Sequence, residues 1–250
     1  MAWLTVLGIP AAVYVTSITA ILFYVNQQPM QRNLLLGTAL LTMGVYSLHR
    51  LSVVEVEPMQ PRHQIAFKHR KGILIASVLF LCSVAIVIAM HQPMTTLLVF
   101  GSIIGMIVYG RETIIKPLRM VTILKPFVVG VSIALFAWVL GNIQASLVAT
   151  VALAIICSAD ALVCDLVDRE YDAATGCTTI AKKLGYRSTW IIALLMYVIA
   201  GIGIFSTQLH SPVGYIFLVV FPIPLVFPIS FRRTLIDVRP LLVLLLAWAI

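Results

Sequence analysis

Apolar runs of about the length of a membrane-spanning helix recur from one end of this chain to the other. A helix needs roughly 20 apolar residues to cross the hydrocarbon core of a bilayer. Only 10% of the 250 residues are charged, against about 25% in soluble domains. The sequence therefore predicts an all-α, polytopic transmembrane bundle that forms a single domain over residues 1–250. The runs predict about nine spans, at residues 3–25, 34–54, 72–90, 95–110, 121–140, 146–164, 188–208, 213–230 and 240–250.

The two ends of the chain give separate expectations. The first run has neither a basic segment before it nor a small-residue cleavage pattern, so we interpret it as a retained span. The last run, 240–250, has 11 residues. As a helix it is about 16 Å long, shorter than the roughly 30 Å hydrocarbon core. Either the chain ends within the membrane, or the sequence stops before the natural terminus.

Basic residues are concentrated in alternate connections between the predicted spans. All Lys and Arg residues except Arg32 lie in the connections 50–71, 111–125, 165–187 and 231–239. The positive-inside rule makes these connections cytoplasmic, with the N-terminus on the same side of the inner membrane. The formal net charge of +8 thus reports membrane topology and does not indicate nucleic-acid binding.

Acidic residues gather at one place on that side. Five of the nine lie within residues 160–172. Asp165, Asp168 and Asp172 are spaced i, i+3, i+7, which places them within about 60° on a helix. Oxygen ligands without a nearby His or Cys suit a hard ion such as Mg²⁺, which fills its shell with water and phosphate oxygens. The spacing predicts a magnesium-bridged phosphate or diphosphate at the cytoplasmic mouth of a membrane cavity.

A simpler interpretation is that these acids solvate a helix end and pair with Arg169, Lys182 and Lys183. Asp160 argues against it, because it lies a turn deeper among apolar residues. A charge at that depth needs a cavity or a partner.

The segment "DLVDREYDAATGCTTIAKKLG" resembles the second aspartate motif of the UbiA superfamily of membrane prenyltransferases. That motif runs approximately DxxDxxxDxxxGxxT with a closing Leu-Gly. The matching residues are Asp165, Asp168, Asp172, Gly176, Thr179, Leu184 and Gly185. The resemblance implies nine spans, Mg²⁺ held by the aspartates, and transfer of an isoprenyl group from its diphosphate to a lipophilic or aromatic acceptor. It implies that all three aspartates are catalytic metal ligands.

Basic residues before the fifth span resemble the family's diphosphate-binding loop. The segment 109–126 supplies Arg111, Lys116, Arg119 and Lys125. Lys and Arg are the side chains that hold a diphosphate, although topology alone also favours them here. The resemblance makes Lys116, Arg119 and Lys125 substrate-binding candidates.

The family's first aspartate motif, NxxxDxxxD, is degenerate in this chain. Its place, residues 46–70, has His49 for the Asn, Val53 for the first Asp and Glu57 for the second. Valine cannot bind a metal, which leaves Glu57 as the candidate ligand. Three interpretations stay open: a one-metal site in which Arg50 or His49 supplies charge, a shifted alignment that uses Glu55, or binding without catalysis.

The resemblance also implies an allylic cation that the protein must shield. Aromatic faces stabilise cations, so Tyr46, Tyr109 and Tyr171, which flank the motif regions, are candidates. Each is also a typical interfacial residue. Tyr109, His49 and Arg50 complete the predicted substrate-binding set.

Other classes remain as alternatives. A non-catalytic member of the fold would bind an isoprenoid, quinone or tetrapyrrole, or act as a subunit of a larger membrane complex. A CDP-alcohol phosphotransferase is excluded because "REYDAATG" follows Asp168 where DGxxAR is required. Transporter sites lie near the membrane midplane on broken helices, whereas these acids cluster at one face.

Overall fold

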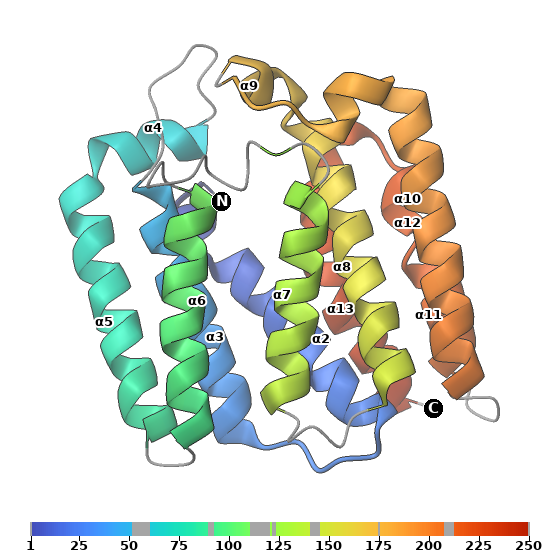
Figure 1. Cartoon of the computed structure of the whole chain (residues 1–250), viewed down its shortest axis with the longest axis horizontal. Coiled ribbons are helices and arrows are strands. Elements are labelled where there is room, and N and C mark those ends of the chain that lie inside the picture. Colours follow the sequence, from blue (N-terminus) through green and yellow to red (C-terminus); the bar gives the residue numbers. More distant parts are fainter. Residues whose placement is uncertain are drawn as a thin grey trace. The chain divides into compact units, whose positions relative to one another are not determined.

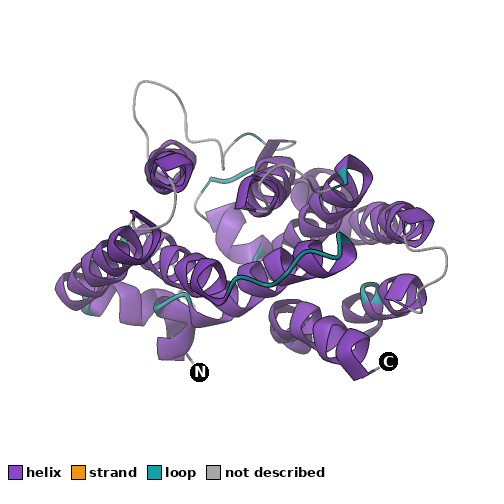
Figure 2. Ribbon diagram, turned by 90° about the horizontal axis from the view of Figure 1, so that it is seen from below, coloured by secondary structure: helices purple, strands orange, loops and turns teal. Residues whose placement is uncertain are grey.

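A computed structural model describes residues 2–51, 61–89, 93–110, 121, 124–140, 146–174, 176–207 and 213–249. Within these residues every regular element is an α-helix, which confirms the predicted all-α fold (Figure 2). The helices are α1 (Ala2–Val6), α2 (Ile9–Val25), α3 (Arg32–Arg50), α4 (Pro61–Lys68), α5 (Arg70–Ala89), α6 (Pro93–Gly110), α7 (Leu124–Leu140), α8 (Leu147–Val167), α9 (Arg169–Ala174), α10 (Ile180–Thr207), α11 (Val213–Val220), α12 (Ile223–Val226) and α13 (Ile229–Ala249).

Two of the described helices, α8 and α10, are long and apolar enough to cross a membrane. On α10 the exposed face carries Leu195, Ile199 and Ile202, whereas Tyr197 and Ile204 are buried. An apolar face that stays exposed at helical spacing is typical of contact with lipid. The number of membrane crossings stays a prediction.

The C-terminal helix begins earlier than the sequence predicted. The window 240–250 is the second half of α13, which starts at Ile229 and has 21 residues. Residues 231–239 were assigned to a connection because they are charged and precede Pro240. In the structure Pro240 lies inside the helix, and the chain breaks at Pro228 instead.

The long helix α10 is interrupted near its start. Gly185 has φ 79° and ψ 173°, a conformation that only glycine adopts readily. It separates a short segment, Ile180 to Leu184, from the long apolar part of α10. The closing Gly of the motif therefore ends one helical segment and starts the next.

The chain forms two compact units, which we describe separately. Unit 1 comprises Met1–Thr16, Gln31–Val121 and Glu170–Cys177. Unit 2 comprises Ser17–Met30, Thr122–Arg169 and Thr178–Ile250. The interpretation of the chain as a single domain stays a prediction.

In unit 2, α8 is the central helix, with α7, α10 and α13 packed against it (Figure 1). Gly130 allows α7 to approach α8 closely. A Cβ atom at Gly130 would lie 2.1 Å from Ser158 Oγ and 2.5 Å from the Ala154 carbonyl oxygen. Close packing at this point holds the start of α7, and with it Lys125, beside the end of α8.

In unit 1, α3 packs against α5 and α6, and α1 packs against α4. Val6, Ala66 and Ile73 form a small buried core that joins α1, α4 and α5. This packing brings the end of α3 and the end of α6 together, where three of the predicted substrate-binding residues lie.

Candidate functional site

The aspartates of the acidic segment lie at the end of α8. Asp160 and Asp165 are inside the helix, and Asp168 is its C-cap residue. The backbone N–H of Asp168 donates to the Cys164 carbonyl at 2.9 Å, which closes the last turn. α9 starts at the next residue. The last two turns of α8 and its C-cap therefore carry three carboxylates of unit 2, those of Asp160, Asp165 and Asp168, in order toward the end of the helix.

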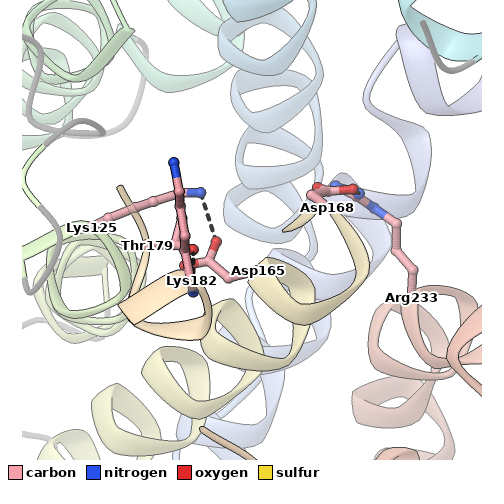
Figure 3. Close-up of polar contacts among 6 residues, drawn as sticks. All are labelled: Lys125, Asp165, Asp168, Thr179, Lys182 and Arg233. Atoms are coloured by element: carbon pink, nitrogen blue, oxygen red, sulfur yellow. Dashed lines mark hydrogen bonds and ion pairs between the residues drawn. The ribbon is translucent and has the colours of Figure 1, made fainter. Parts of the chain in front are cut away.

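Asp165 forms an ion pair with Lys125 of α7. The distance from Lys125 Nζ to Asp165 Oδ1 is 2.6 Å (Figure 3). The Asp165 side chain is only 5% exposed and that of Lys125 is 15% exposed. A carboxylate with so little access to water requires a nearby positive charge. The structure thus places Lys125, a predicted substrate-binding residue, in contact with Asp165, a predicted metal ligand.

Asp168 points away from Asp165, toward Arg233 of α13 (Figure 3). Arg233 Nη1 donates to both carboxylate oxygens, at 3.0 Å and 2.8 Å. This pair is more open to water, with side-chain exposures of 18% for Asp168 and 25% for Arg233. Asp165 and Asp168 thus form ion pairs with Lys125 and Arg233, which are not the residues that the simpler interpretation named (Arg169, Lys182 and Lys183).

Asp160 has the charged partner that its depth requires. Arg239 Nη2 donates to the two Asp160 oxygens at 2.5 Å and 2.6 Å, and the Tyr197 hydroxyl donates to Oδ1. Arg239 Nη1 also donates to the Phe221 carbonyl at 2.5 Å. Both charged side chains are almost fully buried. The prediction that Asp160 needs a partner or a cavity is met by a partner.

Thr179 of the motif has a structural role. It is fully buried, and its Oγ1 accepts a hydrogen bond from the Lys182 backbone N–H at 3.2 Å. A threonine that accepts from the third residue of a helix caps its N-terminus. The motif threonine therefore fixes the start of α10, and Lys182 follows in its first turn (Figure 3).

In unit 1, the His49 ring lies near the rings of both Tyr46 and Tyr109, and Arg50 lies over the Tyr46 ring. The rings of His49 and Tyr109 are 5.9 Å apart, and those of Tyr46 and His49 are 6.5 Å apart. Arg50 is buried, and its guanidinium carbon lies 5.6 Å from the centre of the Tyr46 ring. The sequence predicted these four residues as candidates, and α3 and α6 bring them together.

The last aspartate of the motif, Asp172, belongs to unit 1 and is buried on α9. Its neighbour Tyr171 contacts His63 of α4, with ring centres 4.1 Å apart. His63 is buried as well. Tyr171 therefore contacts α4 within unit 1.

Several predicted residues lie outside the described part of the chain. These are Val53, Glu55, Glu57, Arg111, Lys116 and Arg119. Their roles stay predictions.

The donor set at the end of α8 suits Mg²⁺. It consists of carboxylate oxygens, the ligands that this ion prefers, and Mg²⁺ uses one or two carboxylates where phosphate supplies other oxygens. Within the described residues no group of three or more His, Cys, Asp or Glu side chains is arranged to hold a metal ion. Because Asp165 and Asp168 point apart (Figure 3), each fits a metal as a single carboxylate ligand whose other oxygens come from an anion, and the two do not form an all-protein cage.

Sequence reasoning missed Arg233, Arg239 and Tyr197. The basic residues of α13 were attributed to topology, and Tyr197 lies in an apolar run with no motif around it. A signal for α13 was present. Arg232, Ile236, Arg239 and Val243 recur at helical spacing across Pro240, and all four are buried. That periodicity predicts a helix with two arginines on its inner face.

A model of the UbiA prenyltransferase family matches residues 58–246, more than half of the 250-residue chain. The match contains all of α8 and α10 and α13 up to residue 246, with the three aspartates of the motif and both arginine partners. It begins after His49 and Val53, the degenerate positions of the first motif. Among curated proteins, none matches the chain.

Proposed function

The chain belongs to the UbiA prenyltransferase family, and we propose that it transfers an isoprenyl group from its diphosphate to an acceptor within the membrane, with Mg²⁺ at Asp165 and Asp168. Membership implies an integral membrane protein and, in general terms, membrane prenyltransferase activity. We further propose that the N-terminus and the acidic motif face the cytoplasm at the inner membrane, as the distribution of Lys and Arg predicts.

The observation that carries this proposal is the set of charges at the end of α8. Two carboxylates, Asp165 and Asp168, lie within one turn and face Lys125 and Arg233. A metal diphosphate needs carboxylates for the metal and cations for the phosphate oxygens. The end of α8 has both in adjacent positions.

Each side chain has a distinct task in this proposal. Asp165 and Asp168 would hold Mg²⁺, which would supply positive charge to stabilise the leaving diphosphate. Lys125 donates to the same anion as a fixed positive charge. Asp172 and Glu57 remain candidate ligands on the strength of the motif alone, as Lys116 and Arg119 remain candidate diphosphate ligands.

For the cluster of unit 1 we propose a role on the strength of the family resemblance alone. Tyr46 and Tyr109 offer aromatic faces that stabilise an allylic cation. Tyr46 already carries a cation on its face, the Arg50 guanidinium. We propose that these rings, with His49 and Arg50, contact the isoprenyl group or a lipophilic or aromatic acceptor.

A second candidate function rests on one feature of the sequence. Val53 occupies the place of a metal-binding aspartate in the first motif. A protein that binds an isoprenoid, quinone or tetrapyrrole without catalysis, or that serves as a subunit of a membrane complex, has no need of that ligand.

The test uses the full chain in lipid nanodiscs with isoprenyl diphosphates of several chain lengths and a cell extract as the source of acceptors. Binding is followed by thermal shift and turnover by diphosphate release, each with Mg²⁺ and with a chelator. The variants are Asp165→Asn and Asp168→Asn. Glu170→Gln is the matched control, because the Glu170 side chain is exposed and makes no hydrogen bond or ion pair with the described residues.

Release that requires Mg²⁺ and both aspartates, and that survives in Glu170→Gln, supports the enzyme. Magnesium-dependent binding without release favours the non-catalytic binder. Absence of binding in the wild-type protein rejects both functions and leaves the acidic segment with a structural role.

A further inference from the structure

Arg233 occupies the position between the two Asp168 oxygens that a chelating metal ion would take. One nitrogen, Nη1, lies 3.0 Å and 2.8 Å from the two carboxylate oxygens. A metal ion requires lone pairs of the same oxygens. A metal that binds both oxygens from this side therefore needs the place that Nη1 occupies, so Arg233 competes with that mode of metal binding.

The backbone beside Arg233 is fixed while the Arg233 side chain is accessible. The preceding residue, Arg232, is buried. Its Nε donates to the Phe227 carbonyl at 2.9 Å, and its guanidinium lies 5.3 Å from the centre of the Tyr186 ring. The start of α13 is thus anchored against α12 and α10. Arg233 itself is 25% exposed, so its side chain can change partner without movement of the helix.

A displaced Arg233 would have a suitable new partner close by. A guanidinium has five N–H donors in a fixed fork that matches the oxygens of a phosphate group. The anion that accompanies the metal supplies such oxygens next to the carboxylate that Arg233 has left. The exchange keeps the charges balanced, because the metal replaces Arg233 on Asp168 and the diphosphate replaces Asp168 on Arg233.

We propose that Arg233 is a substrate-binding residue that holds Asp168 in the empty protein and transfers to the diphosphate group when the metal diphosphate binds. This inference rests on the proposed function and extends it, since the motif does not include α13. It assigns Arg233 two opposite effects: the side chain opposes the binding of a metal alone and favours the binding of the diphosphate.

The test measures both effects without turnover. The full chain in nanodiscs is titrated with Mn²⁺ alone, and the free metal is followed by electron paramagnetic resonance. Inorganic diphosphate is then titrated at saturating Mg²⁺ by calorimetry. The variants are Arg233→Gln and Arg233→Lys. The control is Arg187→Gln on α10, which removes the same charge from an exposed side chain that makes no hydrogen bond or ion pair with the described residues.

Arg233→Gln is expected to bind Mn²⁺ several-fold more tightly and inorganic diphosphate about tenfold more weakly, the size of one charge-assisted hydrogen bond. Arg233→Lys keeps the charge but loses the fork, so its diphosphate affinity is expected between those of the wild type and the Gln variant. Arg187→Gln is expected to leave both affinities unchanged.

Other outcomes overturn the inference. If Arg233→Gln lowers both affinities together with the unfolding temperature, or changes neither, Arg233 is structural. If Arg187→Gln reproduces its effects, bulk charge is responsible. In each of these cases the wild type still binds, and the proposed function survives. Failure of the wild type to bind either probe rejects the proposed function and the inference with it.

Discussion

The same two helices, α8 and α13, are joined by two Asp–Arg pairs that differ in burial. In the inner pair, Asp160 and Arg239 are 4% and 3% exposed. In the outer pair, Asp168 and Arg233 are 18% and 25% exposed. The residue types and the helices are the same, so burial is the variable that separates them. The inner pair has the buried environment of a structural contact. The outer pair is open enough to water for its side chains to exchange partners.

The partners of each pair follow this difference. Arg239 also bonds to the Phe221 carbonyl, which lies where α11 breaks, and its guanidinium lies 4.4 Å from the centre of the Phe221 ring. A buried charge with several partners loses all of them if it moves, and water cannot replace them. Near the surface, water and ions compensate an opened pair. The comparison predicts that stability depends on the inner pair and ligand binding on the outer one.

The largest effect is expected from Arg239→Met. It leaves the Asp160 carboxylate buried without its cation, which costs about 3–5 kcal/mol of the free energy of unfolding. Thermal unfolding of the detergent-solubilised protein measures the loss. The double variant Asp160→Leu/Arg239→Met removes both charges and is expected to recover most of it. If Arg239→Met destabilises the protein no more than Arg233→Met does, burial does not distinguish the two pairs.

Asp168→Asn is expected to separate activity from stability at the outer pair. If Asp168 holds the metal as we propose, its loss lowers diphosphate release by about a hundredfold or more, as loss of one preorganised electrostatic contact does. The free energy of unfolding changes by less than about 1 kcal/mol, because water reaches both side chains. Initial rates of diphosphate release and thermal unfolding are measured on one preparation.

Asp160→Asn is the matched comparison for that experiment, since it makes the same chemical change on the same helix. It is expected to lower the unfolding temperature strongly. Equal stability losses in Asp160→Asn and Asp168→Asn would contradict the assignment of roles.

The difference between the pairs also marks the limit of what the sequence predicts. The acidic residues were predicted from local spacing, because Asp165, Asp168 and Gly176 are close in the chain. Their arginine partners were not, because Arg233 and Arg239 lie 65 and 79 residues away from Asp168 and Asp160. Helical periodicity specifies which face is buried, but not which helix will cover it.

The charged part of α13 shows a second reason why the arginine partners could not be predicted from the sequence. Charges before Pro240 are typical of a cytoplasmic connection, and a proline usually marks the start or a break of a helix. The helix nevertheless continues, because Arg239 and Arg232 find acceptors inside unit 2. Only the packed structure reveals that these acceptors exist. The sequence made Lys125 a substrate-binding candidate because it belongs to a motif region. Its contact with Asp165 could not be predicted from the sequence.

Lys125→Met tests whether the loss in the free energy of unfolding increases step by step with the burial of the ion pair. The Asp165–Lys125 pair, with exposures of 5% and 15%, is intermediate between the other two. We expect a loss of about 2 kcal/mol in the free energy of unfolding, within the range for a buried polar group that loses a partner, together with weaker binding of inorganic diphosphate. Lys125→Arg keeps the charge and serves as the control. A loss larger than that of Arg239→Met, measured by thermal unfolding, would show that exposure does not rank the three pairs.

The smallest effect is expected from Tyr197→Phe, which removes the hydroxyl that donates to Asp160. Arg239 Nη2 still contacts both carboxylate oxygens, so the charge of Asp160 stays compensated. The expected loss is about 1 kcal/mol in the free energy of unfolding, typical of one hydrogen bond. Tyr215→Phe is the control, because Tyr215 is exposed and its described contact is the Phe205 ring. If Tyr197→Phe costs as much as Arg239→Met in thermal unfolding, the hydroxyl and not the guanidinium stabilises Asp160. The inner pair would then owe its strength to a hydrogen bond that the outer pair lacks, and burial alone would no longer explain why the two behave differently.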